Sequence, residues 1–489
     1  MFRGIVMPKK VLASTVLSLL AIYGMAQERP NVILIMADDL GWGDVGFNGN
    51  TQIKTPYLDQ LSTQGIIFDR FYSGCSVSSP TRASVLTGRN PLRTGVFNAN
   101  AGILRSEEET LPELLKKEGY TTGHFGKWHL GTLTYKEKDA NRGRPENEHL
   151  YNVPAEHGYD ESFVTESKVP TYDPMLKPVE NDGRFWDCLI KGQESATYGT
   201  YYWRHDGTKE TKNLSGDDSR IIMDRVLPFI EQARETNTPF FSAIWFHTPH
   251  LPCVAGPKYA AMYPNVSLEE RNYFGCITAM DEQIGRLVEY LKKKEIYENT
   301  IICFCSDNGP EVRTPRTAAH LRGKKRDLYE GGIRVPAFAV WSSKLPAGER
   351  TNHVCSTSDY LPTFVELLGL KHPSYEIDGE SLIPALKNGE KRIKPMFFAY
   401  MKQGAVIEQQ YKLYYSKGLY ELYDITSDPS EKQNLANRYP KEVSRLSQIL
   451  DEALERYKAS FDGEEYGTVS VTRIKQQWRS IKSENNNDM

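Results

Sequence analysis

The stretch Val32-Ile33-Leu34-Ile35-Met36-Ala37-Asp38-Asp39 decides the fold class. Its apolar run has the length of a buried strand, and it ends in two carboxylates. Strands that are apolar on both faces are typical of parallel sheets with helices on either side. The stretch therefore predicts a central strand of an α/β fold, with Asp38 and Asp39 at its carboxyl end.

Two later stretches repeat this pattern. Phe240 to Phe246 is followed by His247-Thr248-Pro249-His250, and Ile301 to Cys305 is followed by Ser306-Asp307-Asn308-Gly309. Amphipathic helical stretches separate such runs, which favours a mainly parallel, buried sheet. Because ligands of these sheets collect beyond the carboxyl ends of the strands, we expect the polar residues after the three strands to meet at one edge.

The pattern changes at about residue 390, where short aromatic runs replace the long apolar ones. These runs predict strands at residues 396–400, 411–415 and 419–423. A helix is predicted next, with one apolar face that contains Val443, Leu446, Leu450, Ala453, Leu454 and Tyr457. We predict a catalytic α/β domain over residues 27–390 and a smaller α+β domain, a short antiparallel sheet with a helix, over residues 391–489.

Residues 1–26 have the order of a secretory signal peptide. Basic residues come first, an apolar run from Val11 to Tyr23 follows, and Gly24-Met25-Ala26 supplies small residues at the end. The alternative is a membrane anchor, but this run is shorter than the roughly 20 residues that cross a bilayer. We expect cleavage after Ala26 and export to the periplasm or the medium, without stable membrane insertion.

The charge of the chain bears on its partners. The 489 residues have a formal net charge of −3, and loss of the three basic side chains in residues 1–26 takes it to about −6. A mildly acidic protein has no global attraction for nucleic acid, so we expect no nucleic-acid partner. An anionic substrate would need a local cationic pocket. The seven cysteines are odd in number and lack metal-finger spacing, which does not indicate a disulfide framework.

One short segment carries a nucleophile in an anion-binding setting. Ser78-Ser79-Pro80-Thr81-Arg82 precedes Leu86-Thr87-Gly88-Arg89. Pro80 suits a first helical position and Gly88 a helix end, so Ser78 is expected just ahead of a helix amino terminus. Unpaired backbone N–H groups and the positive end of the helix dipole favour an anion there. Taken alone, the segment is equally typical of a plain helix cap.

The same residues resemble the signature of type I sulfatases, Ser78-x-Pro80-x-Arg82 followed by Leu86-Thr87-Gly88-Arg89. The resemblance implies an alkaline-phosphatase-like fold, a large mixed sheet flanked by helices. It also implies that a serine-type sulfatase maturation enzyme oxidises Ser78 to formylglycine. An unmodified serine lacks the second hydroxyl with which the hydrated aldehyde releases sulfate.

The acidic strand ends resemble the metal ligands of that family. Their hard oxygen donors, without cysteine or a histidine cluster, suit Ca²⁺ or Mg²⁺ rather than Zn²⁺. Either pair alone is also common in turns and helix caps. Together with the serine they predict one Ca²⁺ site, formed by Asp38, Asp39, Ser78, Asp307 and Asn308.

Other blocks of the sequence supply cations and histidines that match the family. Gly126-Lys127-Trp128-His129 is one such block, and the spacing to Glu330-Gly331-Gly332 selects Lys325 rather than Lys324. Pro249-His250 resembles the remaining active-site histidine, with His247 as a nearby structural competitor. The predicted catalytic set is Ser78, Arg82, Lys127, His129, His250 and Lys325.

Two regions are candidates for contacts with the rest of the substrate. The loop after Asp307-Asn308 contains Arg313, Arg316 and His320. The long segment between residues 132 and 220 carries aromatic side chains, which bind sugar rings but are also good core material. These are Tyr151, Trp186, Tyr198, Tyr201, Tyr202 and Trp203.

The resemblance runs from Pro30 to about Ala436 and predicts an exported sulfatase that hydrolyses sulfate monoesters of carbohydrates. One alternative is a phosphate-ester or phosphodiester hydrolase of the same superfamily, which usually holds two transition metals with extra histidine and aspartate ligands. Another is a non-catalytic protein that binds sulfated glycans and whose Ser78 is never oxidised. The sequence leaves open the sugar, the sulfate position, exo or endo action and the oligomeric state.

Overall fold

Strand β1 (Asn31–Ala37) lies inside the large sheet and is buried along its whole length. The structure is a computed structural model that describes residues 29–190, 192–315 and 319–467, so the predicted signal peptide lies outside the described residues. Ile33 and Ile35 belong to one hydrophobic core, whereas Leu34 and Met36 belong to another. Because strand side chains alternate between faces, β1 separates the two cores, as its apolar sequence predicted.

In the described part of the chain the large sheet has nine strands, ordered β13-β2-β12-β11-β1-β10-β5-β6-β9. Their bounds in this order are Glu349–Ser356, Ile66–Tyr72, Ala337–Val340, Thr300–Ser306, Asn31–Ala37, Phe240–Trp245, Thr121–Lys127, Glu161–Thr165 and Trp203–Arg204. Strand β1 pairs in parallel with β10 and β11, while β12 is antiparallel to β11 and β2. The predicted large mixed sheet is confirmed.

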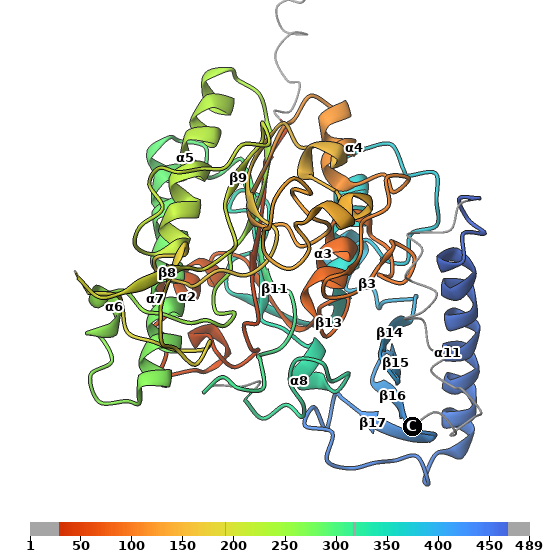
Figure 1. The fold of residues 1–489 in the computed structure, drawn as a ribbon. Helices are drawn as coiled ribbons and strands as arrows, with labels where there is room; N and C mark the ends of the chain where they lie inside the picture. Colours follow the sequence, from red (N-terminus) through yellow and green to blue (C-terminus); the bar gives the residue numbers. More distant parts are fainter. Residues whose placement is uncertain (1–28, 191, 316–318, 468–489) are drawn as a thin grey trace, which may run out of the picture.

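Helices cover both faces of this sheet (Figure 1). On one side lie α2 (Pro56–Ser62), α5 (Asp218–Glu235), α6 (Pro257–Ala260) and α7 (Leu268–Lys293). On the other side lie α3 (Ser78–Thr87) and α4 (Leu111–Lys117). Helix α9 (Tyr360–Leu368) packs into the same core as α3 and α4. No helix in the described residues is long and apolar enough to cross a bilayer.

A second, antiparallel sheet lies in the C-terminal part of the chain. It contains β14 (Met396–Tyr400), β15 (Gln403–Glu408), β16 (Tyr411–Ser416) and β17 (Leu419–Asp424). Helix α11 (Pro440–Phe461) packs on it through Leu446 and Leu450 (Figure 1). The aromatic pattern predicted three of these strands. The sequence did not predict strand β15, because Gly404 and Ala405 are poor strand formers. Burial in the folded protein stabilises these two residues in a strand.

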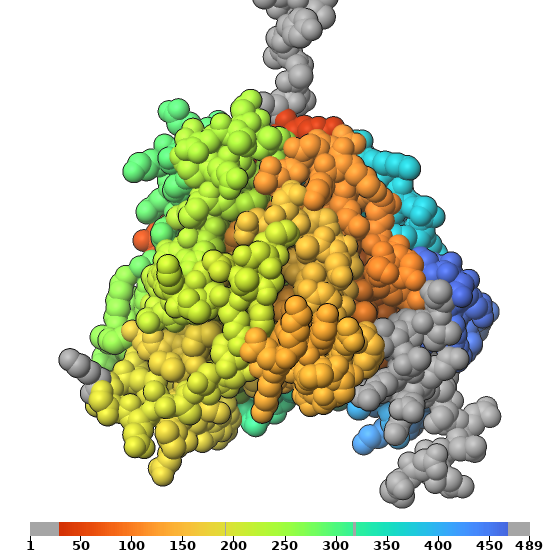
Figure 2. All heavy atoms as spheres, turned by 45° about the horizontal axis from the view of Figure 1, so that its top comes forward, coloured from red at the N-terminus to blue at the C-terminus, as the bar shows by residue number. Residues whose placement is uncertain are grey.

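The long segments between β5 and β10 form much of one surface. In the space-filling view, the orange and gold atoms of roughly residues 90–160 lie directly beside the yellow and lime atoms of residues 160–240 (Figure 2). Of the six aromatic side chains predicted as sugar platforms in this segment, three are core material and three, Tyr151, Tyr198 and Tyr201, are partly buried. Trp186, Tyr202 and Trp203 are buried, and Tyr202 stacks on Phe163 with ring centroids 4.2 Å apart.

Candidate active site

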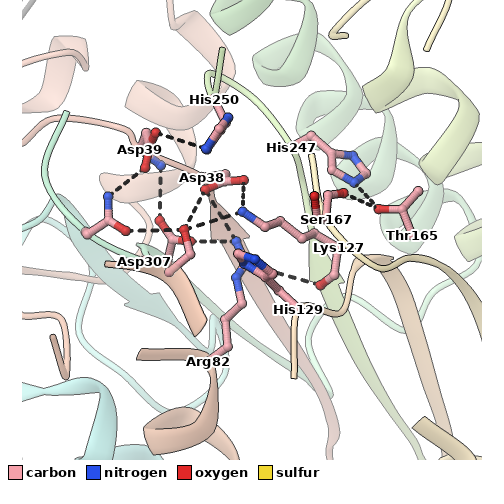
Figure 3. A network of polar contacts seen from close by, with 12 residues as sticks. Asp38, Asp39, Arg82, Lys127, His129, Thr165, Ser167, His247, His250 and Asp307 are labelled. Carbon is pink, nitrogen blue, oxygen red and sulfur yellow. Dashed lines mark hydrogen bonds and ion pairs between the residues drawn. The ribbon is translucent and has the colours of Figure 1, made fainter. Parts of the chain in front are cut away.

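The polar residues that follow three adjacent strands of the large sheet, β11, β1 and β10, meet at one edge, as predicted (Figure 3). Asp38 and Asp39 follow β1, and Asp307 and Asn308 follow β11. The Asp39 backbone N–H donates to Asp307 Oδ1 at 3.0 Å, and Asn308 Nδ2 donates to Asp39 Oδ1 at 2.7 Å. All four side chains are fully buried, so their oxygen atoms lie in a region of low dielectric where charge interactions are strong.

Helix α3 brings the nucleophile candidate to these carboxylates. Ser78 is 2% exposed, and its Oγ lies 3.1 Å from Asp38 Oδ1 and 3.3 Å from Asn308 Oδ1. Arg82 lies one turn later on the same face, with Nη2 2.6 Å from Asp307 Oδ2. Ser78 is the first residue of the helix rather than the residue ahead of it. Pro80 is tolerated at the third position because the first four N–H groups of a helix have no intrahelical partner.

Two buried lysines pair with the two consecutive aspartates. Lys127 Nζ donates to Asp38 Oδ2 at 2.7 Å and lies 3.4 Å from Ser78 Oγ. Lys325 Nζ donates to Asp39 Oδ2 at 2.7 Å. Burial raises the pKa of Asp38, but Lys127 and the other cations around it outweigh burial and hold that pKa well below its usual value. The pair is therefore ionised, and the ammonium of Lys127 stands beside the serine oxygen.

Close backbone packing sets the position of Lys325. The Lys325 N–H donates to Pro310 O at 3.0 Å, and the Gly309 N–H donates to Gly332 O at 3.0 Å. A Cβ atom on Gly309 would lie 2.0 Å from Gly331 O, so only glycine allows the two loops to meet. The Glu-Gly-Gly block thus holds the lysine loop against the Asp307–Asn308 strand end.

The three candidate histidines have different surroundings. His250 Nε2 lies 3.6 Å from Asp39 Oδ2, while its Nδ1 contacts Leu251 O at 2.7 Å. His247 is fully buried between Asp218 Oδ2 at 2.7 Å and Thr165 Oγ1 at 2.6 Å. Figure 3 shows His247 beside Thr165, away from the aspartates that His250 faces. The structure therefore places His250, and not its competitor, beside Asp39 at the acidic cluster.

His129 is held by a polar network that the sequence did not predict. Its Nε2 contacts Asn100 Oδ1 at 2.9 Å, and Asn141 Nδ2 donates to Asn100 Oδ1 at 2.9 Å and to Ser167 Oγ at 3.1 Å. An Nε2–H donor to Asn100 leaves the lone pair on Nδ1, an atom that is buried without a partner among the described residues. Burial, and then Lys127, lower the pKa of His129 well below its usual value, so the ring is neutral and able to accept a proton.

The backbone at two of these positions is strained. Asp39 has φ 66° and His129 has φ 61°, in the left-handed region that residues other than glycine rarely adopt. Such strain persists where surrounding contacts fix it, and it concentrates at functional sites. Both residues are held by the hydrogen bonds described above, which keep their side chains directed into the site.

A cleft with a cavity volume of about 290 Å³ opens from this network to the surface. The predicted residues that line it are Ser78, Lys127, His129, His250, Arg313 and Lys325. Among the lining residues that the sequence analysis missed are Asn98, Asn100, Asn141, Ser167, Lys168 and Tyr400. No motif marked them, because they come from loops whose meeting depends on the fold.

His320 does not line this cleft and instead packs edge-on against Trp42, with ring centroids 5.5 Å apart. Arg316 lies outside the described residues.

The cluster has the geometry to hold a metal ion. Asp38, Asp39 and His250 each offer one ligand atom, and these atoms lie within 4.8 Å of one another. Asp38 Oδ1 and Asn308 Oδ1 both approach Ser78 Oγ, so additional oxygen donors lie at the same point. Lys127 and Lys325 now neutralise the carboxylates, which shows that the site favours positive charge.

Comparison with known proteins assigns the chain to a family. The sequence profile of the sulfatase family matches residues 30–370. The chain belongs to the sulfatase family. It is a sulfuric ester hydrolase of the alkaline-phosphatase-like superfamily. A second profile, described as N-sulphoglucosamine sulphohydrolase, C-terminal, matches residues 320–460 of this sulfatase.

Curated and solved sulfatases resemble the chain over most of its length. The mouse N-acetylgalactosamine-6-sulfatase is 32% identical over 393 residues, covering 76% of this chain and 69% of the mouse protein. The human arylsulfatase A is 30% identical over 493 residues and covers 92% of each chain. The crystal structure of Ps i-CgsB in complex with k-i-k-neocarrahexaose is 28% identical with a TM-score of 0.75, covering 92% of this sulfatase and 97% of that chain.

Proposed function

We propose that this sulfatase removes sulfate from carbohydrate sulfate monoesters, with formylglycine made from Ser78 as its nucleophile and Ca²⁺ as its metal. The observation that carries the proposal is the position of Ser78 Oγ, 3.1 Å from Asp38 Oδ1, 3.3 Å from Asn308 Oδ1 and 3.4 Å from Lys127 Nζ. A hydroxyl in this setting combines metal-ligand oxygens, an ammonium and a helix amino terminus around one reacting atom.

The donor set supports Ca²⁺ rather than a transition metal. Asp38, Asp39, Asp307 and Asn308 would supply hard oxygen ligands, which suit Ca²⁺ or Mg²⁺. His250 adds a nitrogen to the group, but its more distant position suits a contact to substrate. When bound, Ca²⁺ would offset charge on the sulfuryl oxygens and lower the pKa of the attacking hydroxyl. The hydrated formylglycine at position 78 would carry both that hydroxyl and the second hydroxyl needed for sulfate release.

The cationic side chains would stabilise the charge that develops on the sulfate group. Lys127 and Lys325 line the cleft beside Ser78, and Arg82 lies beneath it with a fully buried guanidinium. Charges that are fixed in place before the reaction, in a site shielded from water, are usually the largest catalytic contribution. With a divalent cation bound to the carboxylates of Asp38 and Asp39, both lysines would be free to bind sulfuryl oxygens.

Two side chains have opposite proton states and therefore suit opposite proton transfers. Lys325 Nζ lies 2.7 Å from Asp39 and lines the cleft, so its ammonium would donate a proton to the leaving alkoxide. His129 is neutral with a free Nδ1, so it would accept the proton whose removal allows sulfate release. Burial and Lys325 lower the pKa of His250 well below its usual value, which favours Lys325 as the donor.

Several relatives support a sugar sulfate as the substrate. N-acetylgalactosamine-6-sulfatase is named for a sulfated amino sugar, and the Ps i-CgsB crystal structure holds an oligosaccharide. The cleft would accept a sugar, since asparagines and a tyrosine line it beside the cations. With the signal-like residues 1–26, we propose an exported enzyme that a serine-type maturation enzyme activates and that degrades sulfated glycans in the periplasm or outside the cell.

A panel of paired substrates tests this function. The protein is produced together with a serine-type maturation enzyme and assayed on sulfate monoesters of sugars and on the matching phosphate monoesters and diesters. We expect release of inorganic sulfate and little release of phosphate. Faster hydrolysis of the phosphate compounds would favour the phosphatase alternative. Binding of sulfated sugars without hydrolysis by fully oxidised protein would favour the non-catalytic alternative.

A further inference from the structure

Two cations of the cleft have no anionic partner, unlike the others that line it. Lys127 pairs with Asp38, Lys325 pairs with Asp39, and Arg326 pairs with Glu311 through Nη1 and Oε1 at 2.9 Å. Lys168 and Arg313 also line the cleft. Within the described part of the chain, no carboxylate forms an ion pair with either of them.

Lys168 is the more informative of the two because it is half-buried. Lys168 lies shortly after the end of β6 and is the residue next to Ser167. Figure 3 shows Ser167 close to Lys127. Burial lowers the pKa of Lys168, and the neighbouring charges of Lys325 and Arg313 lower it further, against the opposing effect of Asp39. A desolvated ammonium without a hydrogen-bonded counterion is unfavourable in the resting protein. Unlike a surface lysine, this one gains a favourable contact only from something that enters the cleft.

The charge balance of the site sharpens this point. Asp38 and Asp39 are the anions that offset Lys168 in the structure. A divalent cation on those carboxylates would cancel their effect and leave Lys168 beside the positive charges of Lys325 and Arg313. One sulfate monoester carries a single negative charge, which Lys127 and Lys325 already meet. The cleft therefore has more positive charge than a singly sulfated neutral sugar can balance.

We infer that the substrate carries a second anionic group beside the sulfate that is hydrolysed, and that Lys168, together with Arg313, binds this group. The inference rests on the proposed sulfatase function. A second sulfate ester and the carboxylate of a uronic acid have the required chemistry. Either would form a charge-assisted hydrogen bond to the half-buried ammonium, which is stronger than a bond between neutral groups.

Kinetics on four matched substrates test the inference. They are a monosulfated sugar, the same sugar with a second sulfate, and the monosulfated sugar joined either to a uronic acid or to the corresponding neutral sugar. We expect wild-type kcat/KM to be on the order of 10- to 100-fold higher for one or both dianionic compounds, the effect of one charged hydrogen bond. Comparing the disulfated sugar with the uronate disaccharide identifies which anion is bound.

Variants connect this preference to the residue. Lys168→Gln should reduce the preference for the dianionic substrate by about 10-fold or more, while Lys168→Arg should retain part of it. Lys344→Gln is the matched control, since Lys344 is an exposed lysine in a turn that does not line the cleft. If Lys168→Gln unfolds, as thermal unfolding would show, Arg313→Gln replaces it because the Arg313 side chain is exposed.

A binding measurement separates this inference from the proposed reaction. The Ser78→Ala protein with Ca²⁺ is titrated with the same four compounds by calorimetry, and the dianion should bind on the order of 10-fold more tightly, with a steeper dependence on salt. Equal affinity for monoanionic and dianionic compounds would overturn the inference, as would a Lys168→Gln variant that weakens all four compounds by the same factor. If the wild-type enzyme released sulfate from none of the four compounds while the binding preference was intact, the result would instead count against the proposed function.

Discussion

The described part of the chain holds buried lysine–carboxylate groups in two places, and one of these two opens to solvent. In the C-terminal sheet, Lys412 Nζ lies 3.1 Å from Glu330 Oε1 and 2.9 Å from Glu431 Oε1, and all three side chains are almost completely buried. Tyr72 donates to Glu330 Oε2 at 2.9 Å and closes the group. This closed cluster joins β2, α8 (Glu330–Ile333), β16 and the segment after β17.

The active-site group has similar chemistry, but it lies beside a cleft that is open to solvent. Lys127 and Lys325 are also buried and paired, yet both line a cleft of about 290 Å³. His129 Nδ1 lacks a partner among the described residues, and Ser78 Oγ has room for a ligand beside it. Buried charge therefore does not identify a functional site by itself. What distinguishes the site is that its charges can change partners when a substrate or metal enters.

The largest expected effect follows from replacing the nucleophile. Ser78→Ala should lower kcat by at least about 10⁴-fold, because no other group in the site can take its place. Thermal unfolding should change little, since a serine and an alanine occupy nearly the same volume. Sulfate release is measured on any substrate of the wild-type enzyme, and retention of a substantial rate in this variant would exclude Ser78 as the nucleophile.

Removal of the metal should come next in size. Exhaustive dialysis against a Ca²⁺ chelator should slow turnover by roughly 10²- to 10⁴-fold, since metal charge supplies several kcal/mol of transition-state stabilisation. Added Ca²⁺ should restore activity and raise the melting temperature. Full activity in metal-free protein, verified by elemental analysis, would show that the acidic strand ends have a structural role only.

The lysines of the open site should affect catalysis more than folding. Lys127→Ala and Lys325→Ala should each lower kcat/KM by roughly 10²- to 10³-fold, the range for loss of one charge-stabilising donor. Each variant removes the lysine partner of a buried aspartate, and bound Ca²⁺ would balance the negative charge of that aspartate. Circular dichroism should therefore show that the Ca²⁺-loaded proteins stay folded. Wild-type kcat/KM in either variant would remove that lysine from the proposed pocket.

The lysine of the closed cluster should show the opposite result. Lys412→Met should lower the free energy of unfolding by about 3–5 kcal/mol, because it leaves Glu330 and Glu431 buried without their counterion. Turnover per folded molecule should stay close to wild type, since Lys412 does not line the cleft. Urea unfolding and active-enzyme assays measure the two effects, and a large loss of turnover without destabilisation would break the distinction between the two groups.

A smaller, pH-dependent effect is expected at Glu431. Burial raises the pKa of Glu431 from 4.5 to about 7, since Lys412 can balance only one of two neighbouring carboxylates. The folded protein thus holds this proton more tightly than the unfolded chain. The resulting stabilisation is complete below pH 4.5 and is lost as the pH rises through about 7, a change of about 3 kcal/mol. Glu431→Gln cannot titrate, so its unfolding free energy should lack this decline. Parallel pH curves for the two proteins would contradict the assignment.

The sequence predicted the parts of the site that motifs mark. The apolar run before Asp38-Asp39 identified β1, and the similar run before Asp307-Asn308 identified β11, because buried parallel strands have a strong sequence pattern. Their convergence followed from the rule that ligands collect at the carboxyl ends of such strands. The helix was also predicted, but with Pro80 as its first residue, whereas the structure begins it two residues earlier at Ser78.

The rest of the site depends on loops that no local pattern describes. Asn100, Asn141 and Ser167 come from three separate segments, and only the folded chain brings them together around His129. Lys168 has the sequence context of an ordinary surface lysine, although the structure half-buries it in the cleft. His247 and His250 are three residues apart, and only the resemblance to the family selected His250, because no local pattern tells which of them a turn directs into the site.

The central claim is that catalysis depends on the oxidised form of residue 78. Preparations made with graded amounts of the maturation enzyme are divided, and the Ser78 peptide is examined by mass spectrometry for the loss of one H₂ while sulfate release is assayed on the same samples. We expect the rate of sulfate release to rise in proportion to the oxidised fraction and to vanish where that fraction is zero. Sulfate release at full rate by protein whose Ser78 is wholly unmodified would contradict the claim.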